Sequence, residues 1–162
     1  MTGRTLIITR GAAIAAAYVV LVAAFQPISF GPVQFRVAEA FTLLPCLWFE
    51  AIPGLFVGCM IANILGGLGP WDIFLGSAAT LIAAVLTYAA PNRILAAAAP
   101  VAANGLIVGW YLSFLAGMPL AASIAYVAAG EAMACYALGL PLIRLMERAG
   151  MARKRLPPTN AE

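Results

Sequence analysis

The chain has 162 residues, of which 64% are hydrophobic and 9% are charged, whereas soluble domains carry about 25% charged residues. Its formal net charge is +3, and it contains no histidine, which excludes the usual Ser-His nucleophile and the commonest metal ligand. Its one lysine, Lys154, lies in a basic tail, so no glycine-rich phosphate loop ending in lysine is present and we expect no ATP hydrolysis by this chain.

Six apolar runs predict the fold. A helix needs about 20 apolar residues to cross a bilayer, and breaks rich in glycine and proline separate the runs. The predicted helices cover residues 6–25, 35–49, 53–65, 71–89, 94–116 and 120–146. We therefore expect an all-α integral membrane bundle of about six transmembrane helices.

The first run follows Arg4 and Arg10 and has the charge order of a signal peptide, but its length favours a membrane helix. Residues 26–34 contain two prolines and a glycine, which predicts an ordered loop or a short extended segment. We expect a single transmembrane domain over residues 1–162 that ends in a short basic cytoplasmic tail.

The basic residues predict the topology. An even number of spans places both termini on one side, and all basic residues except Arg36 gather at the ends or in the loop on that side. By the positive-inside tendency, that side is the cytoplasm.

Polar side chains inside the predicted spans mark a candidate site, because each costs free energy in a bilayer unless it has a partner. With this topology, six of them fall in the outer half of the membrane: Arg36, Glu39, Asn63, Asp72, Asn104 and Glu131. They predict a pocket open to the outside. The aromatic residues expected to wall it are Trp71, Trp110, Tyr126 and Tyr136.

These residues can also serve to stabilise the fold instead of binding a ligand. Arg36 and Glu39 lie three positions apart and can form an ion pair, and Asp72 can cap a helix. Asn63 and Asn104 can hydrogen bond between helices. The glutamate of the last helix lies deepest in a span and has the fewest structural uses.

Small residues four positions apart let helix backbones approach closely. In the third and fifth predicted helices, the pairs Gly54/Gly58 and Gly105/Gly109 favour packing within the chain. Small residues nearly encircle the cytoplasmic half of the first helix, which favours docking of a partner membrane protein. The docking residues that we predict are Ala12, Ala13, Ala16 and Ala17.

Five segments carry a resemblance to a known family. They are residues 30–40 (FGPVQFRVAEA), 52–63 (IPGLFVGCMIAN), 66–81 (GGLGPWDIFLGSAATL), 104–109 (NGLIVG) and 130–141 (GEAMACYALGLP). They resemble the QueT family, whose members are similar to S components of energy-coupling factor transporters for queuosine precursors. The resemblance implies capture of a 7-deazaguanine base from outside a bacterial cytoplasmic membrane. It also implies a transmembrane T component and two ATPase subunits as partners, with no cofactor, no metal and no nucleic acid.

Such a ligand suits the predicted pocket. Its guanine-like edge presents an N1 hydrogen and a 2-amino group, which a carboxylate accepts in bidentate fashion. Its carbonyl group needs a donor such as Asn63 or Asn104, and a cationic aminomethyl group needs a second carboxylate. Among Glu39, Asp72 and Glu131, we favour Glu131 and Glu39 as ligand contacts, with Arg36 orienting Glu39.

Three other functions are compatible with part of this pattern. A solitary secondary transporter would cycle protons on Glu131, and a structural membrane subunit would use the polar residues only to join helices. A membrane enzyme is disfavoured, because no nucleophile or metal set accompanies the carboxylates.

Overall fold

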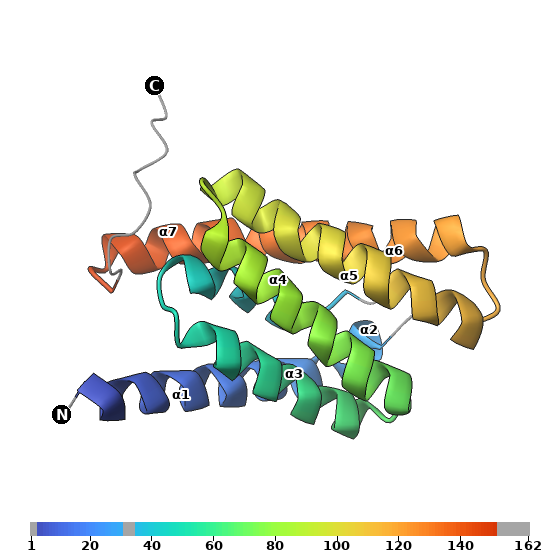
Figure 1. The fold of residues 1–162 in the computed structure, drawn as a ribbon, viewed down its shortest axis with the longest axis horizontal. Coiled ribbons are helices and arrows are strands. Elements are labelled where there is room, and N and C mark those ends of the chain that lie inside the picture. The colour runs from blue at the N-terminus through green and yellow to red at the C-terminus, as the bar shows by residue number, and fades with distance from the viewer. Residues whose placement is uncertain (1–2, 31–34, 152–162) are drawn as a thin grey trace.

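The computed structural model describes residues 3–30 and 35–151, and every regular element in these ranges is a helix (Figure 1). In chain order the elements are α1 (Gly3–Ala24), α2 (Gln26–Ser29), η1 (Val37–Cys46), α3 (Ala51–Gly66), η2 (Asp72–Gly76), α4 (Ser77–Ala89), α5 (Arg93–Leu115), α6 (Leu120–Ala132), η3 (Met133–Gly139) and α7 (Leu140–Arg148). The all-α membrane bundle expected from the sequence is confirmed.

Within the described residues, four helical segments are long and apolar enough to cross a membrane: Arg4–Ala24, Asp72–Ala89, Arg93–Leu115 and Leu120–Arg148. The second of these joins η2 to α4, and the last joins α6, η3 and α7. Two shorter apolar helices, Val37–Cys46 and Ala51–Gly66, complete the bundle. The predicted number of six spans is therefore approximate.

The segment predicted as the second α-helix has a different backbone. Residues Val37–Cys46 form a 3₁₀-helix with Pro45 inside it. A proline has no N–H to donate to the preceding turn, and the tighter 3₁₀ helix rises about 2.0 Å per residue, so ten residues reach about 20 Å. Residues 26–34 were predicted to form an ordered loop or a short extended segment. This prediction was wrong for Gln26–Ser29, which is a helical turn. Residues 31–34 lie outside the described ranges.

Glycines bring two pairs of helices into close contact. A Cβ atom on Gly54 of α3 would lie 2.6 Å from the carbonyl oxygen of Gly11 in α1, and one on Gly109 of α5 would lie 2.7 Å from Cα of Ile124 in α6. Larger residues at these glycines would force the backbones apart. Packing within the chain, as predicted, is thus the role of these glycines.

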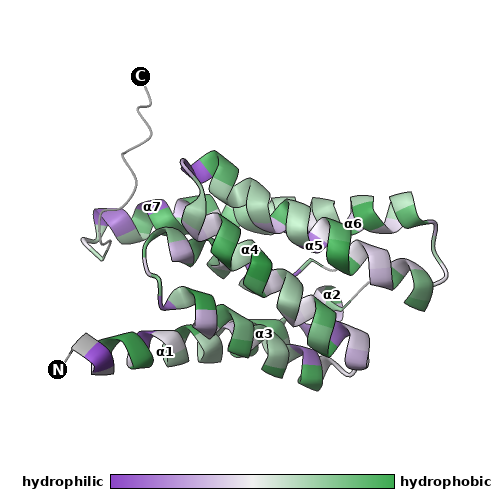
Figure 2. Cartoon of the chain, in the orientation of Figure 1, coloured by the Kyte–Doolittle hydropathy of each residue, from purple (hydrophilic) through white to green (hydrophobic). Residues whose placement is uncertain are grey.

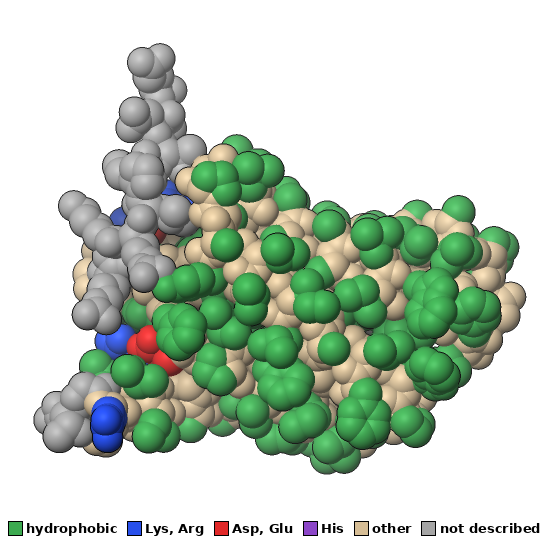
Figure 3. Space-filling model, in the orientation of Figure 1, with side chains coloured by type: hydrophobic (Ala, Val, Ile, Leu, Met, Phe, Trp, Pro, Cys, Tyr) green, Lys and Arg blue, Asp and Glu red, His purple; other side chains and the backbone are tan. Residues whose placement is uncertain are grey.

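Charged residues gather at one end of the bundle. Arg10 Nη1 lies 3.1 Å from Glu50 Oε1, and Arg93 Nη2 lies 2.6 Å from Glu147 Oε1. This end carries the start of α1, the α4–α5 connection and α7, and Figure 2 shows hydrophilic residues there and hydrophobic ones along most of the helices. Figure 3 shows the same charged end beside a largely hydrophobic surface. The basic residues 153–155 lie outside the described ranges.

Candidate functional site

A small cavity lies between η1 and the helices α4, α5 and α6. Its lining residues are Arg36, Glu39, Gly76, Thr80, Asn104, Val108, Val127 and Glu131. Four of the six residues predicted for the site are among them. The cavity volume is about 10 Å³, which is enough for about one water molecule. The sequence predicted an open pocket, but in this structure the charged and amide residues of the lining are buried.

Arg36 lies just before η1 and is held by several groups. Its Nη2 lies 3.4 Å from Asp72 Oδ1, and its Nε donates a hydrogen bond of 3.3 Å to the carbonyl oxygen of Ser29. Its guanidinium carbon lies 4.9 Å from the centre of the Phe30 ring. The predicted ion pair of Arg36 with Glu39 was wrong, since the carboxylate that pairs with Arg36 in the described part of the chain belongs to Asp72.

Asp72 is fully buried at the start of η2. Besides Arg36, the hydroxyl of Tyr111 donates to its Oδ1 at 2.5 Å. Its side chain therefore links α4 to α5 and to η1 and does not cap its own helix.

Glu39 accepts a short hydrogen bond from the hydroxyl of Tyr18, which brings α1 to the cavity. Its backbone carbonyl oxygen accepts from the Thr42 hydroxyl at 2.6 Å. Its second carboxylate oxygen, Oε2, has no hydrogen-bond partner among the described residues. One oxygen of Glu39 is thus fixed and the other is unsatisfied.

Asn104 and Glu131 form the opposite part of the lining. The amide Nδ2 of Asn104 donates a hydrogen bond of 2.8 Å to Glu131 Oε1. The thiol of Cys135 lies 3.9 Å from Glu131 Oε2, a weak contact. Asn104 Oδ1, like Glu39 Oε2, has no partner in the described ranges.

Asn63 lies behind the cavity and is not part of its lining. Its Nδ2 donates a hydrogen bond of 2.8 Å to the backbone oxygen of Asp72 and lies 3.5 Å from Ser77 Oγ. The arrangement joins α3 to the start of α4, which favours the structural reading of this asparagine over a direct ligand contact.

Two stretches of π-helix flank the cavity. Asp72–Gly76 supplies Asp72 and the lining residue Gly76, and Met133–Gly139 begins two positions after Glu131. Such stretches occur frequently at functional sites. A Cβ atom on Gly76 would lie 3.1 Å from the Tyr111 hydroxyl oxygen, so the absence of a side chain there leaves room for the tyrosine beside Asp72.

The aromatic residues predicted as pocket walls lie elsewhere. Trp71, Trp110, Tyr126 and Tyr136 are exposed on the surface of the bundle. The aromatic residues that do reach the site are Tyr18 and Tyr111, which sequence reasoning missed. A tyrosine hydroxyl within an apolar run needs a polar partner when it is buried, and this was the signal available.

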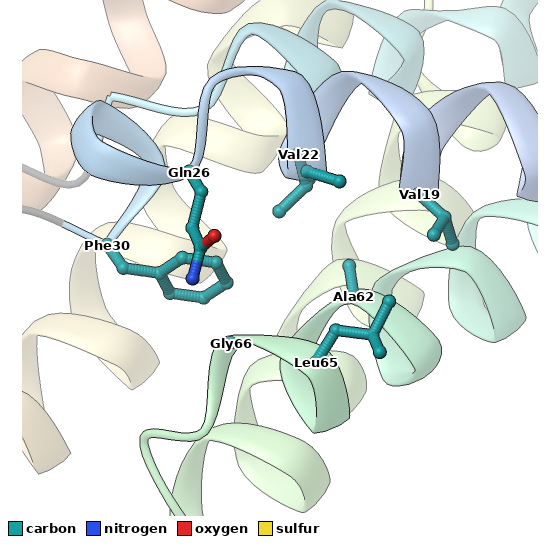
Figure 4. Close-up of a pocket in the computed structure, with 8 residues that line it drawn as sticks. Val19, Val22, Gln26, Phe30, Ala62, Leu65 and Gly66 are labelled. Carbon is teal, nitrogen blue, oxygen red and sulfur yellow. The ribbon is translucent and has the colours of Figure 1, made fainter.

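A separate groove lies beside the site, between α1, α2 and α3 (Figure 4). Among the described residues that line it, Gln26 alone has a polar side chain, and the others include Val19, Val22 and Leu65. Phe30 borders it by packing on Gly66, where a Cβ atom would lie 2.2 Å from the ring. This apolar groove does not offer the partners that a polar heterocycle requires.

The predicted docking residues lie on one helix, α1. Ala12, Ala13 and Ala16 are exposed, and Ala17 is half-buried. Ala12 also lines an apolar groove with Gly11, Gly54 and Val57, between α1 and α3. Part of the small-residue face of α1 is therefore used internally, and Ala13 and Ala16 remain on the surface.

Comparisons with known proteins give one result. The model of the family described as QueT transporter matches residues 8–148. The match covers nearly the whole chain and includes every residue of the cavity lining. Neither the curated proteins nor the solved structures gave a match.

Proposed function

Because the chain belongs to the QueT transporter family, we propose that it captures a queuosine precursor of the 7-deazaguanine type from outside the cell. Members of this family are transporters and not enzymes. They are S components of energy-coupling factor transporters, and they work with a T component and ATPase subunits.

The observation that carries the choice of ligand is the convergence of Arg36, Glu39, Asn104 and Glu131 on one cavity in a largely apolar bundle. A 7-deazaguanine base has donors at N1 and at its 2-amino group and an acceptor at its carbonyl oxygen. The cavity lining offers unsatisfied acceptors and one guanidinium donor. This match of donors with acceptors supports a polar two-ring base over an apolar ligand.

We assign direct ligand contacts to the four residues that line the cavity. Asp72 and Asn63, both predicted as substrate-binding residues, are assigned to positioning: Asp72 holds Arg36, and Asn63 holds the backbone of Asp72. Their substitution should therefore weaken binding through the orientation of Arg36.

The exposed small residues of α1 are proposed as the docking face for the T component, with two ATPase subunits completing the transporter. The charged end of the bundle is proposed to face the cytoplasm of a bacterium, with both termini and the basic tail on that side. In this orientation the whole chain acts as one transmembrane domain.

Binding to the purified protein in detergent tests the function. The ligands are 7-aminomethyl-7-deazaguanine, 7-cyano-7-deazaguanine, queuine and guanine. We expect tight binding of at least one deazaguanine and weaker binding of guanine. If folded protein bound none of them, the proposed ligand class would be wrong, and uptake without partner subunits that depends on a proton gradient would identify a solitary transporter instead.

A further inference from the structure

The charges around the cavity do not balance. One arginine and three carboxylic acid side chains are buried there: Arg36, Asp72, Glu39 and Glu131. Arg36 pairs with Asp72, while the other ion pairs of the described residues, Arg10–Glu50 and Arg93–Glu147, lie at the charged end. Neither Glu39 nor Glu131 forms an ion pair in the part of the chain that the structure describes, although Arg36 lines the same cavity.

Neutral donors hold these two carboxyl groups. Tyr18 donates to Glu39, and Asn104 donates to Glu131. These bonds fix one oxygen of each carboxyl group but bring no positive charge. A carboxylate buried away from water without a cation is unfavourable, so a ligand that supplies a cation gains affinity from this site.

The unsatisfied acceptors belong to the same lining. Glu39 and Asn104 are each only 2% exposed, and Oε2 of Glu39 and Oδ1 of Asn104 have no hydrogen-bond partner among the described residues. A buried acceptor without a partner is costly. A ligand that binds this site should therefore carry several donors, and at least one of them should be charged.

The chemistry of a 7-deazaguanine sets how it can meet this lining. Its 7-substituent and its carbonyl oxygen project from neighbouring positions on one edge of the rings, while N1 and the 2-amino group lie on the other side of the carbonyl. Arg36 and Glu39 are three residues apart at the start of η1, whereas Asn104 and Glu131 lie on α5 and α6. The start of η1 thus supplies the donor for the carbonyl oxygen and the acceptor for the 7-substituent. Helices α5 and α6 supply the acceptors for N1 and the 2-amino group.

We infer that the site selects a positively charged 7-substituent, with Glu39 as its counter-ion, Arg36 on the adjacent carbonyl oxygen, and Asn104 with Glu131 on the N1 and 2-amino edge. This inference rests on the proposed function, and it adds that the site distinguishes charged from neutral 7-substituents. A base with an aminomethyl group at position 7 should bind more tightly than one with a neutral cyano group.

The test compares these two ligands on the full-length protein in detergent by titration calorimetry. We expect wild-type protein to bind 7-aminomethyl-7-deazaguanine at least about tenfold more tightly than the 7-cyano analogue, as for a hydrogen bond between charged partners. Glu39→Gln should reduce the affinity for the aminomethyl ligand much more than the affinity for the cyano ligand, and so remove most of this preference. Glu131→Gln should reduce the affinity for both ligands and leave the ratio of the two affinities unchanged. Glu147→Gln, which alters a carboxylate at the charged end, serves as the matched control and should change neither affinity.

The outcomes separate the two claims. Equal affinity of wild-type protein for both ligands, or tighter binding of the cyano ligand, would overturn the charge selection and leave the proposed function intact. Loss of the preference in Glu131→Gln but not in Glu39→Gln would overturn the assignment of Glu39. Binding of neither ligand by folded wild-type protein would overturn the proposed function itself. The wild-type comparison needs no variant, so it decides the charge selection even if Glu39→Gln does not fold.

Discussion

At the scale of single residues, the site holds its carboxyl groups with neutral side chains. The three pairs are Tyr18 with Glu39, Tyr111 with Asp72, and Asn104 with Glu131. Each donor comes from a different helix from the carboxyl group that it binds. The geometry of the site therefore depends on helix packing, and each donor can be removed without changing the charge of the protein.

Tyr111→Phe tests this dependence. The substitution removes the 2.5 Å hydrogen bond to Asp72 and leaves a buried carboxylate oxygen with fewer donors. We expect a loss of about 1 to 3 kcal/mol of stability, measured by unfolding in detergent, and weaker ligand binding because Arg36 is less firmly held. Tyr126→Phe is the control, since Tyr126 is exposed. Equal stability of the two variants would contradict a structural role for the Tyr111 hydroxyl.

The sequence predicted which polar residues are unusual but not how they pair. The free-energy cost of polar groups in a membrane singled out six residues, and the structure places four of them on one cavity; their contact with a ligand stays a prediction. Arg36 was paired with Glu39 because they are neighbours on a helix. Its partner is Asp72, 36 residues away, a contact that only the packing of η1 against α4 creates.

At the scale of elements, the contact of α1 with α3 depends on glycine. Gly54→Leu places a side chain where a Cβ atom already lies 2.6 Å from the backbone of Gly11. We expect a loss of about 1 to 3 kcal/mol from overpacking, read from thermal unfolding in detergent. Ala125→Leu adds the same side chain at an exposed position of α6 and should be close to wild type. A Gly54→Leu protein as stable as this control would show that the two helices separate at little cost.

The exposed face of α1 gives a prediction about assembly. Ala13→Trp or Ala16→Trp adds bulk at exposed positions that are not part of the cavity lining. Copurification with the T component and the ATPase subunits should be lost, while ligand binding by the isolated protein should be retained. Ala129→Trp on the exposed face of α6 is the control for added bulk. Normal assembly of both α1 variants would exclude these positions from the docking face.

Helices were easier to predict than their geometry. Apolar length and the breaks at glycine and proline located every long helix within a few residues; for example, the predicted break at residues 66–70 matches the end of α3 at Gly66. The 3₁₀ backbone of η1 and the π-helices η2 and η3 were not predicted, because composition and hydropathy do not distinguish them from an α-helix.

At the scale of the whole molecule, the segregation of charge predicts the orientation in the membrane. The native cysteines are all buried, so a single added cysteine can report on each side. In intact cells an impermeant maleimide should label Ala116→Cys, near the α5–α6 connection, and should label Pro91→Cys, before α5, only after the cells are opened. The reverse pattern would place both termini outside and contradict the positive-inside assignment.

The small volume of the cavity has a kinetic consequence. Space for about one water molecule is smaller than a two-ring base, so we expect the lining residues to separate before a ligand enters and before it leaves. In stopped-flow fluorescence, we expect the observed association rate constant to reach a plateau as ligand concentration rises, because opening limits it. Diffusion-limited entry would instead give an observed rate constant that keeps rising linearly with ligand concentration. Slow opening also lengthens residence time, so a scarce molecule once caught would stay bound while the partner subunits engage.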